Sequence, residues 1–142
     1  SSVFSVGTDS GVNGNTDAMI AYLWTSIQGF SKFGSYRGND GNDGAFCYTG
    51  FKPAYVLTKK YSATGASWQI CDNKRPGFNV INDSLSVDST AVEQTHVAMD
   101  FCANGFKCRN SNRDSNHNAL YIFMAFAEQP FVNSEGVPAN AE

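Results

Sequence analysis

Apolar and polar residues alternate most clearly between Val97 and Phe131. The dipeptide Asn104-Gly105 predicts a β-hairpin there, because both central residues of a two-residue hairpin turn take positive φ. With this turn, Ala103 faces Phe106 and Phe101 faces Cys108 across the ribbon. One face of the hairpin is then apolar and predicted to be core, with the residues Val97, Met99, Phe101, Ala103, Phe106 and Cys108.

A polar loop, Arg109–Asn118, separates this hairpin from the strand-like run Leu120–Ala127. That run is apolar on both faces, and so is the earlier run Met19–Trp24. Two explanations stay open, because a strand with one wet face would expose these side chains to water. Either both strands lie inside one domain, or they form a subunit interface made of Tyr22, Trp24, Tyr121 and Phe123.

The N-terminal part repeats this arrangement. A short strand is predicted at Val3–Val6 and a longer one at Ala18–Ser26, with a glycine-rich polar loop between them. Chance and a true internal repeat both explain the likeness, which is slight. With a true repeat, residues 1–28 are the closing strands of a preceding unit. Since the chain has no initiator Met, we expect a processed product or the C-terminal piece of a longer polypeptide.

The remaining pattern predicts an all-β fold. Further strands are expected at Gly29–Tyr36, Ala45–Tyr48, Tyr55–Lys60, Trp68–Asp72 and Asn79–Ile81. Asn82–Gln94 favours either one helical turn or an irregular connection, and residues 132–142 are expected to be a tail. About nine or ten short strands with polar turns are typical of a two-sheet antiparallel β-sandwich. We therefore expect a jelly-roll-like sandwich over residues 29–131.

Composition and charge narrow the class of protein. The chain has 142 residues, enough for one domain, and it is rich in Gly, Phe and Tyr, with only 16% charged residues. A net charge of -3 without a stripe of Lys and Arg argues against a nucleic-acid partner. No apolar run reaches the ~20 residues of a membrane helix, so membrane insertion is not expected.

The four cysteines lie at irregular spacings that match no zinc motif. We expect free thiols, although a bridge between Cys47 and Cys71 stays open. A bridge between Cys102 and Cys108 is disfavoured, because the hairpin directs these side chains to opposite faces.

No catalytic motif is found, and no enzymatic activity, cofactor or metal is predicted. His96 and Asp100 share one strand face, as an acid–base pair or as part of a polar row. Trp68 is either a core residue or a platform for a sugar ring. The carboxyl groups that could serve a glycosidase are not paired by any pattern; they belong to Asp72, Glu93 and Glu128.

Two polar loops are the candidate binding sites, because loops mounted on a rigid scaffold often carry function. Their amide, guanidinium, imidazole and carboxylate groups suit sugar hydroxyls or a peptide backbone. The candidate residues are Asn39, Asp40, Asn42 and Asp43 in the first loop, and Arg109, Asn110, Asn112, Arg113, Asp114, Asn116 and His117 in the second. The oxygens of the first loop could also hold calcium, but their spacing matches no EF-hand.

An ordered set of motifs carries a family resemblance. The segments FSKFGSY, YTGFKPAYVL, DNKR, ANGFK and YIFMAFAE follow one another between about Gly29 and Phe131. Together they resemble the C-terminal domain of tail-fibre and receptor-binding proteins of bacteriophages, especially marine ones. The four cysteines depart from that pattern.

The resemblance implies a virion structural protein that is made in the host cytoplasm and works outside the cell on the tail fibre. It implies a homo-oligomer, expected to be a homotrimer, joined to an upstream tail-fibre segment. Its partner would be a host surface polysaccharide or another receptor. Two alternatives remain: a purely structural subunit of a fibre shaft, capsid decoration or extracellular filament, and a glycan depolymerase.

Overall fold

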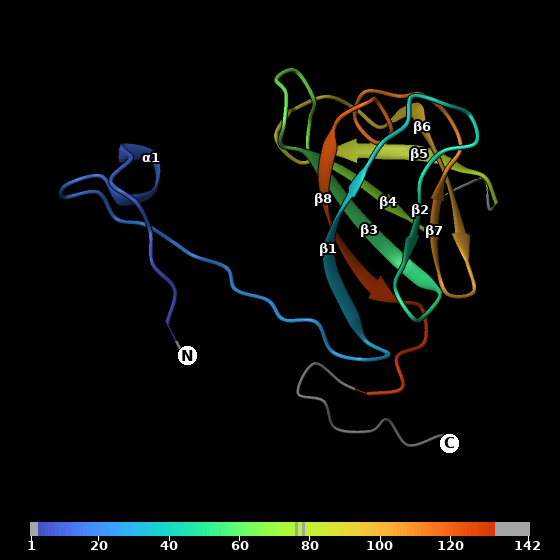
Figure 1. Ribbon diagram of the computed structural model, residues 1–142, viewed down its shortest axis with the longest axis horizontal. Coiled ribbons are helices and arrows are strands. Elements are labelled where there is room, and N and C mark those ends of the chain that lie inside the picture. The colour runs from blue at the N-terminus through green and yellow to red at the C-terminus, as the bar shows by residue number, and fades with distance from the viewer. Residues whose placement is uncertain (1–2, 76, 78, 133–142) are drawn as a thin grey trace.

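The computed structural model describes residues 3–75, 77 and 79–132, which form one curled β-sheet preceded by an extended segment (Figure 1). The elements in chain order are α1 (Ser10–Asn13), β1 (Ser31–Arg37), β2 (Phe46–Tyr48), β3 (Pro53–Lys60), β4 (Gln69–Asp72), β5 (Ile81–Ser86), β6 (Gln94–Cys102), β7 (Gly105–Cys108) and β8 (Leu120–Ala127).

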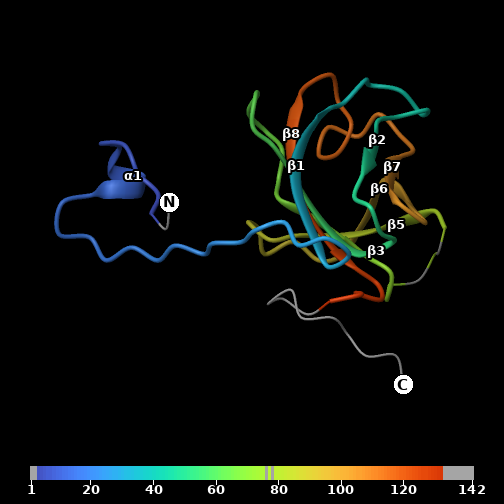
Figure 2. The same ribbon diagram turned by 60° about the horizontal axis from the view of Figure 1, so that its bottom comes forward.

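The strands form a single eight-stranded antiparallel sheet in the order β1-β8-β3-β4-β5-β6-β7-β2. The sheet curls until its two ends approach each other (Figures 1 and 2). There, the ring of Tyr36 on β1 lies edge to face with Phe106 on β7, with ring centroids 5.9 Å apart. The all-β antiparallel prediction is confirmed. The predicted division into two sheets is not, because β5 pairs with β4 on one side and with β6 on the other, which leaves one continuous, nearly closed barrel-like sheet.

Residues on the inner face of the sheet form the core. The hairpin β6–β7 contributes its predicted face, with Val97, Phe101 and Phe106 all buried. Phe123 of β8 packs edge to face on Phe106, with centroids 5.2 Å apart. Of the residues predicted for that face, Ala103 alone is exposed, because it lies in the turn.

The predicted hairpin turn is misplaced by one residue, which shifts the pairing of its two strands by two. Phe101 pairs with Phe106 and Cys102 with Gly105, so the turn is Ala103-Asn104. The reason is that Gly105 serves a different purpose: a Cβ atom there would lie 2.2 Å from the carbonyl oxygen of Cys47 on β2. The glycine lets two backbones approach instead of supplying a positive φ. Each residue of β6 pairs with a β7 residue two positions earlier than predicted. Because side chains on a strand alternate with a period of two, the same residues still face the core.

Most other strands begin or end within about two residues of their predicted positions, as is usual for element boundaries. The exception is Asn82–Gln94, for which the sequence predicts a helical turn or an irregular connection. Both predictions are wrong for the first part of this segment, because β5 continues to Ser86. These polar residues are held across the ladder by hydrogen bonds, for example from Thr95 Oγ1 to Asp83 Oδ1 at 2.7 Å. Apolar alternation therefore could not reveal the strand.

The two predicted N-terminal strands, Val3–Val6 and Ala18–Ser26, are wrong. Residues 3–26, here called the arm, contain only α1 and extended chain, and both views show the arm leading away from the sheet (Figures 1 and 2). A strand needs a neighbouring strand for its ladder of backbone hydrogen bonds, and among the described residues the arm forms no such ladder. Its contacts with β1 involve side chains, from the Ser31 hydroxyl to the Thr25 carbonyl and from the Phe33 N–H to Ser26 Oγ. The strand-loop-strand unit behind the proposed repeat is therefore not formed.

The two faces of β8 have different surroundings. Tyr121, Phe123 and Ala125 point into the core and are 0%, 7% and 0% exposed. The predicted subunit interface is therefore wrong for Tyr121 and Phe123, because the core of the same chain covers them. Tyr22 and Trp24 on the arm are exposed.

All four cysteines are free. Burial raises the pKa of Cys71 to about 12 and that of Cys108 to about 12, and it raises the pKa of Cys47 as well. Cys102, which faces away from the core, is partly exposed.

Gly105→Ala should destabilise the fold, because its Cβ would collide with the Cys47 carbonyl. Overpacking of this kind costs about 1–3 kcal/mol, which chemical denaturation would show as a lower unfolding midpoint. Gly41→Ala is the matched control, since its Cβ would lie 3.5 Å from the nearest atom, an ordinary contact. Equal stability of the two variants would contradict the close approach.

Native protein treated with iodoacetamide at pH 8 should be alkylated at Cys102 alone. The thiolate is the reactive form, and burial that raises the pKa of the other three thiols suppresses it. Mass spectrometry of the peptides would read out the pattern, and the same treatment in denaturant should label all four. Native labelling of Cys71 at the rate of Cys102 would contradict this core.

Candidate functional site

Four connections of the sheet, including its longest, lie together at one end of the molecule, and a further long connection, between β4 and β5, lies at the other end. Because neighbouring strands are antiparallel throughout, the odd-numbered strands all run toward that end. The connections that follow them are residues 38–45, 61–68, 87–93 and 109–119, here called the loop end (Figure 1). The sheet begins at Ser31 and finishes at Ala127 on the opposite side.

Asn116 joins the two loops that the sequence singled out. Its Nδ2 donates to Asn39 Oδ1 at 3.0 Å and to the carbonyl of Gly41 at 2.8 Å, while its Oδ1 accepts from the backbone N–H of Asn39 at 3.2 Å. Its own carbonyl accepts from the N–H of Asp40 at 2.8 Å. Asn116 is fully buried, so these contacts are shielded from water and the two loops form one structure.

Two tyrosines hold the second loop from the core side. The Tyr121 hydroxyl donates to the carbonyl of Arg113 at 2.7 Å and accepts from the N–H of His117 at 3.0 Å. The Tyr36 hydroxyl donates to the carbonyl of Ser115 at 2.6 Å. Burial raises the pKa of Tyr121 to about 12 and that of Tyr36 well above its usual range, so both hydroxyls stay protonated and keep donating.

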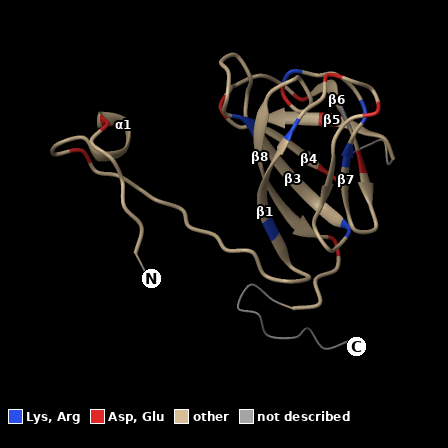
Figure 3. Ribbon diagram, viewed as in Figure 1, with Lys and Arg blue, Asp and Glu red and all other residues tan. Residues whose placement is uncertain are grey.

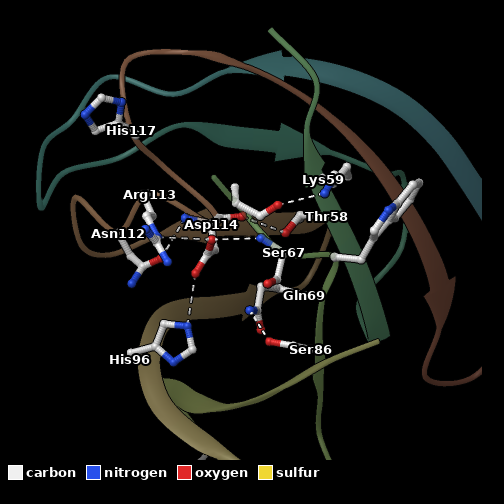
Figure 4. Close-up of polar contacts among 12 residues, drawn as sticks. Thr58, Lys59, Ser67, Gln69, Ser86, His96, Asn112, Arg113, Asp114 and His117 are labelled. Atoms are coloured by element: carbon white, nitrogen blue, oxygen red, sulfur yellow. Dashed lines mark hydrogen bonds and ion pairs between the residues drawn. The ribbon is translucent and has the colours of Figure 1, made fainter. Parts of the chain in front are cut away.

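Asp114 links the same loop to three more segments, the connection 61–68, β6 and β3 (Figure 4). Its Oδ1 accepts from the backbone N–H of Ser67 at 3.1 Å, and its Oδ2 lies 3.2 Å from Nε2 of His96 on β6. The Oγ1 of Thr58 donates to the Asp114 carbonyl at 3.3 Å. Asp114 as a residue is 4% exposed, so its carboxylate is buried and anchors the loop.

The third and fourth loops are connected in turn. The backbone N–H of Trp68 donates to Asp88 Oδ1 at 3.2 Å, and the Lys59 ammonium lies 3.5 Å from Asp88 Oδ2. Burial raises the pKa of Asp88, but the hydrogen bond from Trp68 and the charge of Lys59 outweigh it, so the net pKa is lowered. The four loops thus form a continuous, braced platform.

The predicted site residues divide by burial. Those exposed at the loop end are Asn39, Asp40, Asn42, Asp43, Arg109, Arg113 and His117; Asn110 and Asn112 are partly buried, and Asp114 and Asn116 are buried. The prediction that Asp114 and Asn116 contact a receptor is therefore wrong, since their polar atoms bind the neighbouring loops. The sequence did not reveal that Tyr36, Ser67 and His96 anchor the second loop, because a local pattern contains no sign of contacts between distant segments.

Some of the exposed charged side chains at the loop end form ion pairs. Asp43 lies 2.5 Å from the Lys107 ammonium, and this hydrogen bond with its charge lowers the pKa of Asp43. Arg109 pairs with Asp100 at 3.0 Å, so Asp100 does not pair with His96. Charges of both signs surround the loop end (Figure 3). Such a mixed surface suits neutral, hydroxyl-rich ligands better than a polymer of one charge.

The carboxylates considered for glycoside hydrolysis are engaged elsewhere. Asp72 pairs with Arg75 at 2.8 Å, and Glu93 pairs with the same guanidinium. Glu128 pairs with Lys52 at 2.6 Å, which lowers the pKa of Glu128. Within the described residues, no group of three His, Cys, Asp or Glu is placed to hold a metal ion.

No helix in the described part of the chain has the length and hydropathy that a membrane span requires.

Comparison with known proteins identifies a family for this chain. No curated protein and no solved structure matches the chain. One family does, described as a domain of unknown function (DUF7483), and the match covers residues 1–130. Since this match spans nearly the whole sequence, the chain belongs to the DUF7483 family.

Proposed function

We propose that this domain is a non-enzymatic module of a phage tail fibre that assembles as a homo-oligomer, expected to be a trimer, and binds a host-cell surface receptor at the loop end. The proposed receptor is a glycan. The protein would be made in the host cytoplasm, joined to an upstream fibre segment, and act outside the cell on the virion.

One observation carries the proposal: the two polar loops that the sequence singled out, 38–45 and 109–119, lie together at one end, and the sheet begins and finishes at the other. This polarity suits a module attached at one end that presents the opposite end to a partner. Buried anchors such as Asn116 fix the loops, so a ligand does not have to order them on binding.

The chemistry of the loop end favours sugars. The Arg113 side chain is 68% exposed, and His117, Asn39 and Asn42 are also exposed at the loop end. Their donors and acceptors match glycan hydroxyls, and each contact alone is weak. With several copies on one fibre, avidity rises by about 10²-fold or more without any tight pocket.

We further propose that the curled sheet works as the two facing layers of a sandwich, with β1, β8, β3 and β4 in one and β6, β7 and β2 in the other. The support is that Tyr36 and Phe123 of the first layer both pack on Phe106 of the second. The purely structural alternative, a shaft, decoration or filament subunit, draws support from the exposed apolar side chains of the arm.

The double variant Arg113→Ala/His117→Ala should lose host binding and keep most of its stability, because both side chains are exposed and the ion pair that is lost, from Arg113 Nε to Asp114 Oδ1 at 3.7 Å, involves a guanidinium that is largely in solvent. Since hydrogen bonds from charged groups contribute about 1.5–3 kcal/mol, we expect binding to weaken about tenfold or more. Adsorption of labelled protein to host cells and a glycan array would measure this.

Lys74→Ala is the matched control for that variant, a cation removed from the other end of the sheet, and it should bind normally. Unchanged adsorption of the double variant would favour a purely structural role. Release of oligosaccharide from host polysaccharide would instead favour a depolymerase.

Asn116→Ala should weaken both stability and receptor binding, because it leaves buried backbone groups of the two loops without partners. Each unsatisfied group costs about 1–3 kcal/mol. Asn116→Asp should also destabilise, since a carboxylate cannot donate to the Gly41 carbonyl. Asn42→Ala serves as the exposed control, and a stability loss as large as that of Asn116→Ala would contradict the anchoring role.

A further inference from the structure

An apolar groove of about 660 Å³ lies on the outer face of the sheet, which points away from the core. Its walls come from four separate parts of the sheet and from the end of the arm. The main lining residues are Trp24, Phe33, Leu57, Trp68, Ile122 and Met124.

The groove belongs to an apolar row that crosses five neighbouring strands. The directly paired residues along this row are Phe33, Met124, Leu57, Ile70 and Leu85. All five are only partly buried. A row of large apolar side chains on the outer face of a sheet is typical of a surface that another segment covers, because removing these side chains from water is favourable.

The arm carries the complementary surface. Its segment Met19–Leu23 includes Ile20, Tyr22 and Leu23, which are 80%, 72% and 71% exposed. Only Asp9 and Asp17 are charged in the arm, and neither lies within this segment. The segment Met19–Leu23 is thus largely exposed, although the same chain has an open apolar groove, whose wall includes Trp24 of the arm but none of these five residues.

The arm is directed away from its own groove. Tyr22 stacks on Trp24 with centroids 6.0 Å apart, and Trp24 stacks on Phe33 with centroids 6.4 Å apart. The chain of stacked rings thus joins β1 to the arm, and both views show the arm leading away from the sheet (Figures 1 and 2). Trp24 is the arm residue that lines the groove, and the chain before it leads away.

We infer that the groove is an acceptor site for the arm of a second copy of this chain, with Met19–Leu23 of one copy lying over Ile122 and Met124 of the next. This inference rests on the proposed assembly of the domain as a homo-oligomer, and it names the two surfaces that make the contact. Each copy donates one arm and accepts one, and an exchange whose rotation closes into a ring, such as the proposed trimer, leaves no arm and no groove empty.

The area is sufficient for a stable assembly. One tyrosine buries roughly 150–250 Å². With its three large apolar neighbours, the segment removes on the order of 500 Å² from water and covers a similar area of the groove. Counted on both partners, one contact buries about 1,000 Å², the lower bound for a specific interface, and a dimer that exchanges both arms buries about 2,000 Å².

Cysteine cross-linking tests the contact directly. In a Cys102→Ser background, two differently tagged full chains, one with Ile20→Cys and one with Ile122→Cys, are coexpressed and oxidised. A disulfide that joins the two tags is the expected result. Lys74→Cys in place of Ile122→Cys is the matched control and should give no cross-link. A bond formed within single chains of the double variant Ile20→Cys/Ile122→Cys would overturn the inference.

Light scattering of the unmodified full chain should show an oligomer. Ile20→Ser/Tyr22→Ser should raise its dissociation constant about 30-fold or more, as for the loss of an aromatic anchor. Val12→Ser, which removes an exposed apolar residue from α1, should leave it unchanged. A chain that stays monomeric, or an apolar small molecule retained in the native mass spectrum without cross-linking, would overturn the inference.

The two proposals fail separately. A monomer that still adsorbs to host cells through Arg113 and His117 would overturn arm exchange and leave the receptor proposal standing. A cross-linked oligomer that binds no host cell would support arm exchange and count against the receptor proposal.

Discussion

The packing of Tyr36 between the two ends of the sheet is the interaction on which the remaining structure depends. Its ring lies parallel to that of Tyr121, with centroids 5.1 Å apart, and edge to face with that of Phe106. A flat sheet of this length would expose its apolar inner face, and curling brings that face onto itself. The hydroxyl group of Tyr36 also donates a hydrogen bond to the Ser115 carbonyl in the loop 109–119. Closure of the sheet and placement of this loop are therefore coupled.

The loop end is ordered by buried polar groups rather than by apolar packing. A buried amide or carboxylate is costly unless its hydrogen bonds are made, and Asn116 and Asp114 make theirs to other loops. These contacts join segments that are distant in sequence, such as Asn39 and Asn116. The platform is therefore a product of the whole fold, and a single loop taken alone would not keep its shape.

Local alternation of apolar and polar residues was enough to predict most of the sheet. The strands around Phe33, Val56 and Phe101 and the core face of β6–β7 were readable, because side chains on a strand alternate between two faces. Prediction failed where an apolar pattern lacked a partner, as in the arm, and where polar residues made a strand, as in β5. It also placed Asn116 among the exposed residues, since a uniformly polar run does not reveal which side chain turns inward.

The anchoring of the loop end separates two sets of residues. Asn116, Asp114 and the hydroxyl groups of Tyr36 and Tyr121 keep the backbone in place, and the side chains that reach solvent take little part in that task. Arg113 and His117 contribute mainly backbone groups to those anchors. Their side chains are thus free to change while the scaffold beneath persists, so one architecture could acquire new recognition properties by exchanging a few surface residues.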